Sequence, residues 1–330
     1  MEAEARGLED RFGRRFRYLR LSVTEACNFR CAYCLPDGYR KQAPHDFLSE
    51  AEIARLVRAF AGVRVGKVRL TGGEPSVRRD LTPIIEAVAS TRGVCKTALT
   101  TNGWNLPVKA AEWRRAGLTH LNVSLDTLDE NAFQRLTGSR RHADILRGID
   151  GALGLGFASV KLNAVLLPET AGEGFGRFAA FVRERPVTVR FIELMRTAAN
   201  ADYFAVNHVP GRTLRLGLAE HGWRPVGRPP DGGPAEEFEH PDHAGRFGLI
   251  APYGPGFCDG CNRLRVTARG KLRLCLFGDG GLDLRDLLQA DGDREALQTR
   301  VRRALGDKAP AHRLAFADSG DVRDLAQMGG

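Results

Sequence analysis

The sequence predicts an α/β fold in which an open, partial (β/α)6 barrel is followed by a C-terminal region that closes it. Apolar, β-branched segments alternate with helical segments from Arg17 to about Met195. Strands separated by helices pair in parallel through right-handed crossovers, and six units are too few for a closed eight-stranded barrel. We therefore divide the chain into an N-terminal segment (1–16), a partial barrel (17–200) and a C-terminal domain (201–330). The active site is expected at the carboxyl ends of the strands.

Six segments are expected to form the strands of the barrel, because they are apolar and rich in β-branched residues. They are Tyr18–Thr24, Val68–Thr71, Thr97–Thr101, Leu121–Leu125, Val160–Leu167 and Val187–Leu194.

Helix signals lie between these strands. Ser49 and Glu52 have the spacing of a capping box, in which the serine side chain accepts from the N3 amide and the glutamate reaches back. Asp80 is expected to cap the next helix. Pro107 suits the first turn of the third helix, and Gly117 suits its end.

After about residue 199 the regular alternation ends. Phe247–Tyr253 is expected to be a strand, and Leu264–Thr267 with Leu272–Leu276 a hairpin. Leu282–Gln289 and Arg294–Leu305 have amphipathic patterns and are expected to be helices.

Composition and charge limit the class of protein. With 43% hydrophobic and 27% charged residues among 330, the chain can bury a large core and is not disordered throughout. It has no apolar run of about 18 residues, and its charged N-terminus lacks an apolar core. We therefore expect no membrane span, no secretory signal and a cytoplasmic location. The formal net charge of +9 comes mainly from arginines spread along the chain. This pattern indicates a general arginine bias rather than a nucleic-acid face, and it also fits an anionic small substrate.

Three cysteines crowd into the loop after the first expected strand, as Cys27-x3-Cys31-x2-Cys34. Without a secretory signal, clustered thiols indicate metal rather than disulfides. Zinc is the alternative, but zinc sites usually have four ligands, and no fourth cysteine or histidine is near. Three thiolates suit a [4Fe-4S] cluster with one iron left open. Cys95 stands alone and is expected to be a small buried residue.

This spacing resembles the signature of the radical S-adenosylmethionine (SAM) enzymes, and further residues resemble their SAM site. Tyr33 resembles the aromatic residue near the SAM adenine, and Gly73, in the GGEP segment after the second strand, resembles the segment that meets the SAM amino group. Ser124 and Met195 fall at matching positions after the fourth and sixth strands. Each also has an ordinary structural explanation, such as a strand-ending turn or a core methionine.

A second triplet, Cys258-x2-Cys261-x13-Cys275, contains the expected hairpin. A second [4Fe-4S] cluster with an open iron is preferred because no fourth ligand is obvious. A zinc ribbon is the alternative, with His240 or His243 as the fourth ligand.

The run from Phe257 to Thr267, with the segments at 270–273 and 275–277, closely resembles the GTP 3′,8-cyclase family of molybdenum cofactor biosynthesis. The resemblance extends over nearly the whole chain and includes the terminal Gly-Gly, with a weak stretch at about 206–246. Other matching segments are Arg17–Cys34, Lys67–Pro75, Asn122–Asp126, Lys161–Asn163 and Arg190–Met195.

The resemblance implies the reaction and its cofactors. Two [4Fe-4S] clusters and SAM are expected, with the first cluster reducing SAM to give a 5′-deoxyadenosyl radical. That radical would take the 3′ hydrogen of GTP, and attack on C8 of guanine would give the 3′,8-cyclised nucleotide. The second cluster would meet the guanine edge. The resemblance assigns GTP binding to Arg20, Arg69, Thr100, Lys161, Arg263, Leu264 and Arg265.

Lys161 also stands out without the resemblance. It lies within an apolar strand, where an unpaired lysine is costly, and a partner anion facing inward explains it. Arg190 in the sixth strand supports the same argument. A lysine at a strand end that reaches solvent is the alternative.

The resemblance also implies partners: an unidentified reductant, the cyclic pyranopterin monophosphate synthase that acts next, and a second copy in a homodimer. Two other functions stay open from the residues. One is a radical SAM enzyme that modifies peptides and carries an auxiliary cluster. The other is a basic zinc-ribbon protein that binds nucleic acid, which leaves the first cysteine triplet without a role.

Overall fold

The computed structural model describes residues 7–40, 46–227, 229, 232–323 and 325–326. Its strands form one sheet in the order β12-β11-β10-β1-β2-β3-β4-β5-β6-β9-β8-β7. Their bounds are β1 Tyr18–Thr24, β2 Lys67–Gly72, β3 Lys96–Thr101, β4 His120–Ser124, β5 Ser159–Leu166, β6 Thr188–Glu193, β7 Arg224–Val226, β8 Glu236–Glu239, β9 Arg246–Ile250, β10 Arg263–Val266, β11 Lys271–Arg273 and β12 Leu282–Asp283.

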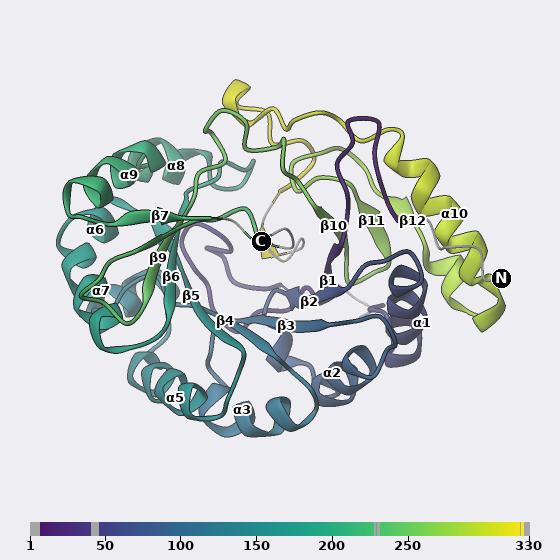
Figure 1. The fold of residues 1–330 in the computed structure, drawn as a ribbon, viewed down its shortest axis with the longest axis horizontal. Coiled ribbons are helices and arrows are strands. Elements are labelled where there is room, and N and C mark those ends of the chain that lie inside the picture. Colours follow the sequence, from purple (N-terminus) through teal and green to yellow (C-terminus); the bar gives the residue numbers. More distant parts are fainter. Residues whose placement is uncertain (1–6, 41–45, 228, 230–231, 324, 327–330) are drawn as a thin grey trace.

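The sheet is curved, and helices cover its outer side (Figure 1). None of the described helices is long and apolar enough to cross a membrane. The bounds of the helices are α1 Glu50–Ala61, α2 Leu81–Ala89, α3 Leu106–Arg115, α4 Glu130–Thr137, α5 His142–Gly154, α6 Pro168–Ala171, α7 Glu173–Glu184, α8 Ala201–Asn207, α9 Gly211–Glu220 and α10 Arg294–Leu305.

The six predicted barrel strands are confirmed as β1 to β6, and neighbours among them pair in parallel. The C-terminal region continues this parallel sheet at both edges, because β10 pairs with β1 and β9 pairs with β6. Hydrogen bonds between the described strands do not close the sheet, whose order ends at β12 and β7. The fold is therefore a partial barrel whose two open edges are extended by residues after 200. The predicted domain boundaries themselves stay predictions.

Alternation along the barrel strands separates a core from a polar interior. In β5, Val160, Leu162 and their alternate neighbours are buried against the helices. Lys161 and Asn163 lie between them and line an internal cavity. The cavity therefore lies on the inner face of the curved sheet.

The helix signals were mostly correct. Ser49 and Glu52 form the predicted capping box at the start of α1, and Pro107 lies in the first turn of α3. Gly117 follows α3 with a positive φ of 97°. Asp80 occupies the predicted N-cap position of α2, but its carboxylate makes no capping hydrogen bond. Both carboxylate oxygens instead accept from the Arg78 guanidinium, at 2.7 and 2.8 Å.

Two further predictions were corrected. Leu282–Gln289 is not an α-helix: it forms β12, which pairs with β11, and then a short 3-10 helix, Arg285–Leu288. The leucines of this segment do not share one buried helix face: Leu284 and Leu288 are buried, whereas Leu282 is exposed. Cys95 is exposed rather than buried, because it lies in the loop just before β3. The hairpin formed by β10 and β11 and the helix α10 are confirmed.

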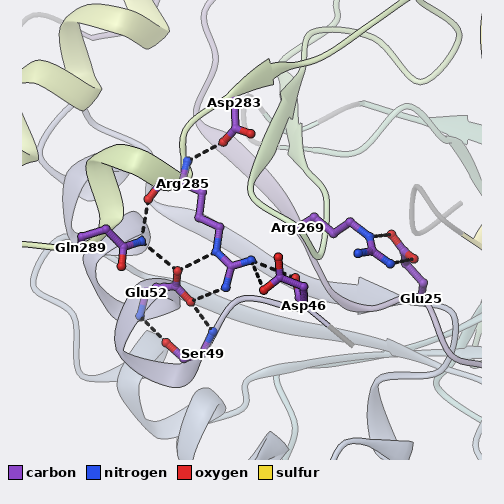
Figure 2. A network of polar contacts seen from close by, with 8 residues as sticks. All are labelled: Glu25, Asp46, Ser49, Glu52, Arg269, Asp283, Arg285 and Gln289. Atoms are coloured by element: carbon purple, nitrogen blue, oxygen red, sulfur yellow. Dashed lines mark hydrogen bonds and ion pairs between the residues drawn. The ribbon is translucent and has the colours of Figure 1, made fainter. Parts of the chain in front are cut away.

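A buried carboxylate ties α1 to the segment after β12 (Figure 2). Glu52 accepts from Arg285 Nε at 2.8 Å, from Gln289 Nε2 at 3.1 Å and from the Ser49 amide at 2.7 Å. Arg285 also pairs with Asp46 at 2.6 Å. Burial alone would raise the pKa of Glu52, but these bonds, Arg285 first, lower it to about 2. The ionised carboxylate therefore stabilises this junction.

Candidate active site

The inner face of the sheet encloses a cavity of about 450 Å³ that both cysteine triplets line. Residues from β1 to β10 and from the loop before β8 also line it. Two segments more than 200 positions apart in the sequence thus contribute thiols to one space.

The loop that carries the first triplet packs closely against Gly72 and Gly73 of the GGEP segment. The Gly73 amide donates to Thr24 O at 3.0 Å, and the Glu74 amide donates to Ala26 O at 2.7 Å. A Cβ on Gly73 would lie 2.3 Å from Ala26 O, and one on Gly72 would lie 2.2 Å from Thr24 O. Glycine at these positions therefore permits the close approach of the cysteine loop.

The first three thiols lie close enough to influence one another. Burial raises the pKa of Cys27 to about 11. Burial, with the charges of Asp126, Cys34 and Cys27, raises the pKa of Cys31 well above its ordinary value. Among the described residues, no three His, Cys, Asp or Glu side chains form a set suited to a single metal ion. All three thiols line the same cavity, and cysteine thiolates are the ligands that iron–sulfur clusters take.

The second triplet gathers in the same cavity. Burial, with the charges of Cys275 and Cys261, raises the pKa of Cys258. Burial also acts to raise the pKa of Cys261, but Lys308 and Arg263 lower it overall. These thiols therefore also fit a cluster.

The histidines of the zinc-ribbon alternative lie elsewhere. His240 and His243 pack on Trp223, with ring centroids 5.3 and 4.7 Å away. Neither histidine lines the cavity that the second triplet borders. The two histidines that the sequence offered as the fourth ligand of a zinc ribbon therefore lie away from the second triplet.

The N-terminal segment holds the loop of the second triplet. The Arg14 guanidinium donates to Cys258 O at 3.2 Å, to Ala309 O at 2.7 Å and to Pro310 O at 2.6 Å. Its Nε is fixed by Asp10 Oδ2 at 2.7 Å. Residues before the barrel thus help to position the second thiol group.

Glu25 and Arg269 connect the two cysteine regions directly (Figure 2). Arg269, in the turn between β10 and β11, donates to both carboxylate oxygens of Glu25, at 3.1 and 3.2 Å. Glu25 lies two residues before Cys27, and β11 leads to Cys275. A bidentate arginine–carboxylate pair fixes relative orientation as well as distance.

Between the two triplets, the wall of the cavity is strongly cationic. Strand register places Arg20 beside Arg69 and Arg265, with Lys67 beside Lys96 in the neighbouring row. The described basic residues that line the cavity are Arg20, Lys67, Arg69, Lys96, His120, Lys161, Arg190, Arg263, Arg265 and His312. Such a wall suits a ligand with several negative charges.

The pKa values of two side chains in the wall, Tyr18 and His120, are lowered by these positive charges. Burial acts to raise the pKa of Tyr18, but Arg69, Arg20 and Lys67 lower it to about 6. Burial and the nearby cations, Lys67 first, lower the pKa of His120 to about 4.

Arg69 is held in place before any ligand binds. Its Nε donates to Tyr18 Oη at 2.5 Å, and its Nη1 donates to Leu99 O at 3.0 Å and to Thr100 Oγ1 at 3.2 Å.

Most predicted site residues line this one cavity. They are Cys27, Cys31, Cys34, Cys258, Cys261, Cys275, Tyr33, Gly73, Ser124, Met195, Arg20, Arg69, Thr100, Lys161, Arg263 and Arg265. Leu264 differs: the residue is 1% exposed, belongs to the hydrophobic core and is not one of the residues that line the cavity.

Sequence reasoning missed several residues of the wall, among them Tyr18, Lys67, Lys96, His120 and Glu237. The first four are the first residues of β1 to β4, and each lies in step with a residue that the sequence did assign, although only Tyr18 fell within a predicted strand. That alternation was the available signal. Glu237 gave no such signal, because it lies on a short strand in the stretch of weak resemblance.

Comparison with known proteins places the chain in a family. Residues 21–182 match the model of the radical SAM superfamily, and residues 187–314 match the model described as Molybdenum Cofactor Synthesis C. A GTP 3′,8-cyclase of Aeromonas hydrophila is 52% identical over 328 residues, covering 98% of this chain and 96% of the relative. This chain belongs to the GTP 3′,8-cyclase family. A relative of that name from Stenotrophomonas maltophilia is also 52% identical, covering 98% of this chain and 99% of its own.

Solved structures agree on the fold. The crystal structure of Streptococcus suis SuiB bound to S-adenosylmethionine matches with a TM-score of 0.63. The match covers 86% of this chain and 68% of SuiB at 14% identity. At that identity the likeness shows the fold alone.

Proposed function

We propose that this chain is a GTP 3′,8-cyclase, which converts GTP to (8S)-3′,8-cyclo-7,8-dihydroguanosine 5′-triphosphate in the first step of molybdenum cofactor biosynthesis. The single observation that carries the proposal is the cavity, which has a cysteine triplet at each of two sites and a cationic wall between them. Membership of the GTP 3′,8-cyclase family supports it.

Cys27, Cys31 and Cys34 would hold the first [4Fe-4S] cluster, whose open iron would take SAM. When bound, the reduced cluster and SAM supply a radical that removes a hydrogen atom from the substrate. Gly73, Ser124 and Met195, all on the cavity wall, would contact SAM together with Tyr33.

The chain fixes Tyr33 from two sides. Its hydroxyl donates to Asp126 Oδ2 at 2.9 Å, and its carbonyl accepts from Asn200 Nδ2 at 3.0 Å. Tyr33 is thus held before SAM binds, which would lower the entropy cost of ordering it.

The cationic wall would bind the triphosphate. Arginine guanidinium groups form charge-assisted and often bidentate bonds to phosphate. In this assignment Arg20, Arg69, Thr100, Lys161, Arg263, the Leu264 backbone and Arg265 bind GTP. Because Arg69 is already fixed by Tyr18 and Leu99 O, it would meet the nucleotide with little reorganisation.

Cys258, Cys261 and Cys275 would hold the second [4Fe-4S] cluster, against which the guanine edge would lie. This division orients the nucleotide: the base goes to one thiol group and the ribose toward the other. The enclosing strands would limit the access of water to the reacting carbon, and this protects a radical reaction from side reactions.

The remaining partners belong to the same proposal. The reductant is unidentified, the next enzyme is the cyclic pyranopterin monophosphate synthase, and a homodimer and a cytoplasmic location are expected.

Anaerobic reconstitution tests the proposal. The protein is loaded with iron and sulfide, given SAM, dithionite and either GTP or ATP, and the nucleotides are analysed by mass spectrometry. We expect two four-iron clusters per chain and a cyclised product from GTP. A chain that holds two clusters and cleaves SAM yet leaves GTP unchanged would overturn the assignment of substrate.

A further inference from the structure

One carboxylate interrupts the cationic wall. Among the described lining residues, the carboxylates are those of Asp126, Glu193 and Glu237. Asp126 accepts from Tyr33 at the SAM end, and Glu193 pairs with His208 at 2.9 Å. Glu237 instead forms an ion pair with Lys161, within the wall assigned to the triphosphate.

Sheet register brings Glu237 to this position. Asn163, Arg190, Gly248 and Glu237 lie in one row across β5, β6, β9 and β8. Gly248 leaves room for the arginine, because a Cβ there would lie 2.8 Å from Arg190 Cγ.

Arg190 is the second cation near the carboxylate. Its Nε and Nη2 donate to Asn163 Oδ1 at 3.1 and 2.7 Å. Burial and Arg69 lower the pKa of Arg190 to about 10, while Glu237 acts to raise it. Glu237 thus influences both Arg190 and Lys161.

The pair is shielded from solvent on both sides, since the side chains of Lys161 and Glu237 are 22% and 25% exposed. Burial and Arg190 lower the pKa of Lys161, and Glu237 opposes this effect. The carboxylate therefore helps to keep Lys161 charged in an empty site.

The same carboxylate opposes a triphosphate. A nucleotide phosphate placed against Lys161 would lie near a second anion, and like charges in a partly buried site repel strongly. Lys161 has three N–H donors but only one positive charge, which cannot neutralise both anions, so phosphate binding is strengthened when the Glu237 carboxylate moves away.

We propose that Glu237 is an internal counterion that occupies the phosphate position at Lys161 until the nucleotide displaces it. The inference rests on the proposed function, because it takes the displacing anion to be the substrate triphosphate. Glu237 is a positioning residue: it keeps Lys161 charged and aimed into the cavity and lowers the affinity of the site for nucleotide anions.

Glu237→Gln tests this inference, because glutamine keeps the shape and can still accept a hydrogen bond from Lys161. Binding of GTP, inorganic triphosphate, guanosine and SAM is measured at equilibrium on the reconstituted protein, without turnover. We expect GTP and triphosphate to bind about tenfold more tightly, with unchanged guanosine and SAM affinities. The gain should shrink in a Lys161→Met background, since the competition for Lys161 is then absent.

Glu239→Gln is the matched control, since Glu239 lies on the same strand but pairs with Arg246 at the surface. It should leave all four affinities unchanged. Unchanged or weaker triphosphate binding by Glu237→Gln, with SAM binding intact, would overturn the counterion role. So would a gain that is undiminished in the Lys161→Met background. Failure of the unsubstituted protein to bind GTP would instead refute the proposed function, so the two failures are distinct.

Discussion

Replacing Gly73 by alanine should disrupt the first cluster and leave the second cluster intact. The added Cβ would lie 2.3 Å from Ala26 O and 2.6 Å from Glu25 O, where real Cβ atoms essentially never come closer than 3.0 Å. Both neighbours are backbone atoms, so no side-chain rotation relieves the overlap. The loop that carries Cys27 must move.

The cost follows from these contacts. Overpacking of this kind costs about 1–3 kcal/mol. The shift also strains the bonds from Gly73 N to Thr24 O and from Glu74 N to Ala26 O, each worth about 1 kcal/mol. We expect a total of roughly 3 kcal/mol, concentrated on the loop of the first triplet. A displacement of about 1 Å at a reacting site lowers rates about a hundredfold.

The assay is iron content, cluster spectroscopy and 5′-deoxyadenosine formation on one anaerobic preparation. Gly73→Ala should lose most of the first cluster and its SAM cleavage while the second cluster remains. Gly151→Ala is the control, because nothing lies within 4 Å of its Cβ position in α5, and it should stabilise the helix by about 0.5–1 kcal/mol. Full iron content and normal SAM cleavage in Gly73→Ala would refute the argument from close approach.

Three further predictions concern the junction, the phosphates and the guanine end. Glu52→Gln should lower the free energy of unfolding by about 1–3 kcal/mol near neutral pH, whereas Glu50→Gln on the exposed face should not. Because the pKa of Glu52 is lowered to about 2, its contribution is complete above its unfolded pKa of about 4.3 and is lost as the pH falls toward 2. Denaturation at several pH values checks this, and a difference that persists at pH 2 would contradict it. Arg265→Ala should weaken GTP binding about ten- to a hundredfold with little change for SAM, and the exposed Lys271→Ala should change neither. Equal losses for both ligands would count against a phosphate contact. Cys275→Ala should keep the first cluster and some SAM cleavage but abolish cyclisation, and retained cyclisation without the second cluster would reject the role in holding guanine.

The barrel could be predicted because its strands carry their own signal. β1 to β6 are short, β-branched and separated by helix signals such as the box at Ser49 and Glu52. The two cysteine triplets could be predicted as cluster ligands from their spacing alone, and they mark the two ends of the site. The cost of an unpaired lysine in an apolar strand also singled out Lys161, which lies on the cavity wall.

Residues that depend on distant partners could not be predicted in this way. Arg14 reaches the carbonyl of Cys258 across 244 positions, and Glu237 meets Lys161 across 76. Local pattern says nothing about such pairs: register between β5, β6, β9 and β8, for example, brings Glu237 to Lys161. The helix expected after β11 was wrong for the same reason: pairing of β12 with β11 overrides an amphipathic pattern.

The most direct test of the central claim is the fate of one hydrogen atom. The claim is that the cavity holds GTP with its base at the second triplet and C3′ facing the first. Anaerobic turnover with GTP deuterated at C3′ should give 5′-deoxyadenosine that carries the deuterium, together with the cyclised nucleotide. Unlabelled 5′-deoxyadenosine, with the deuterium retained in unchanged GTP, would contradict that placement of the substrate.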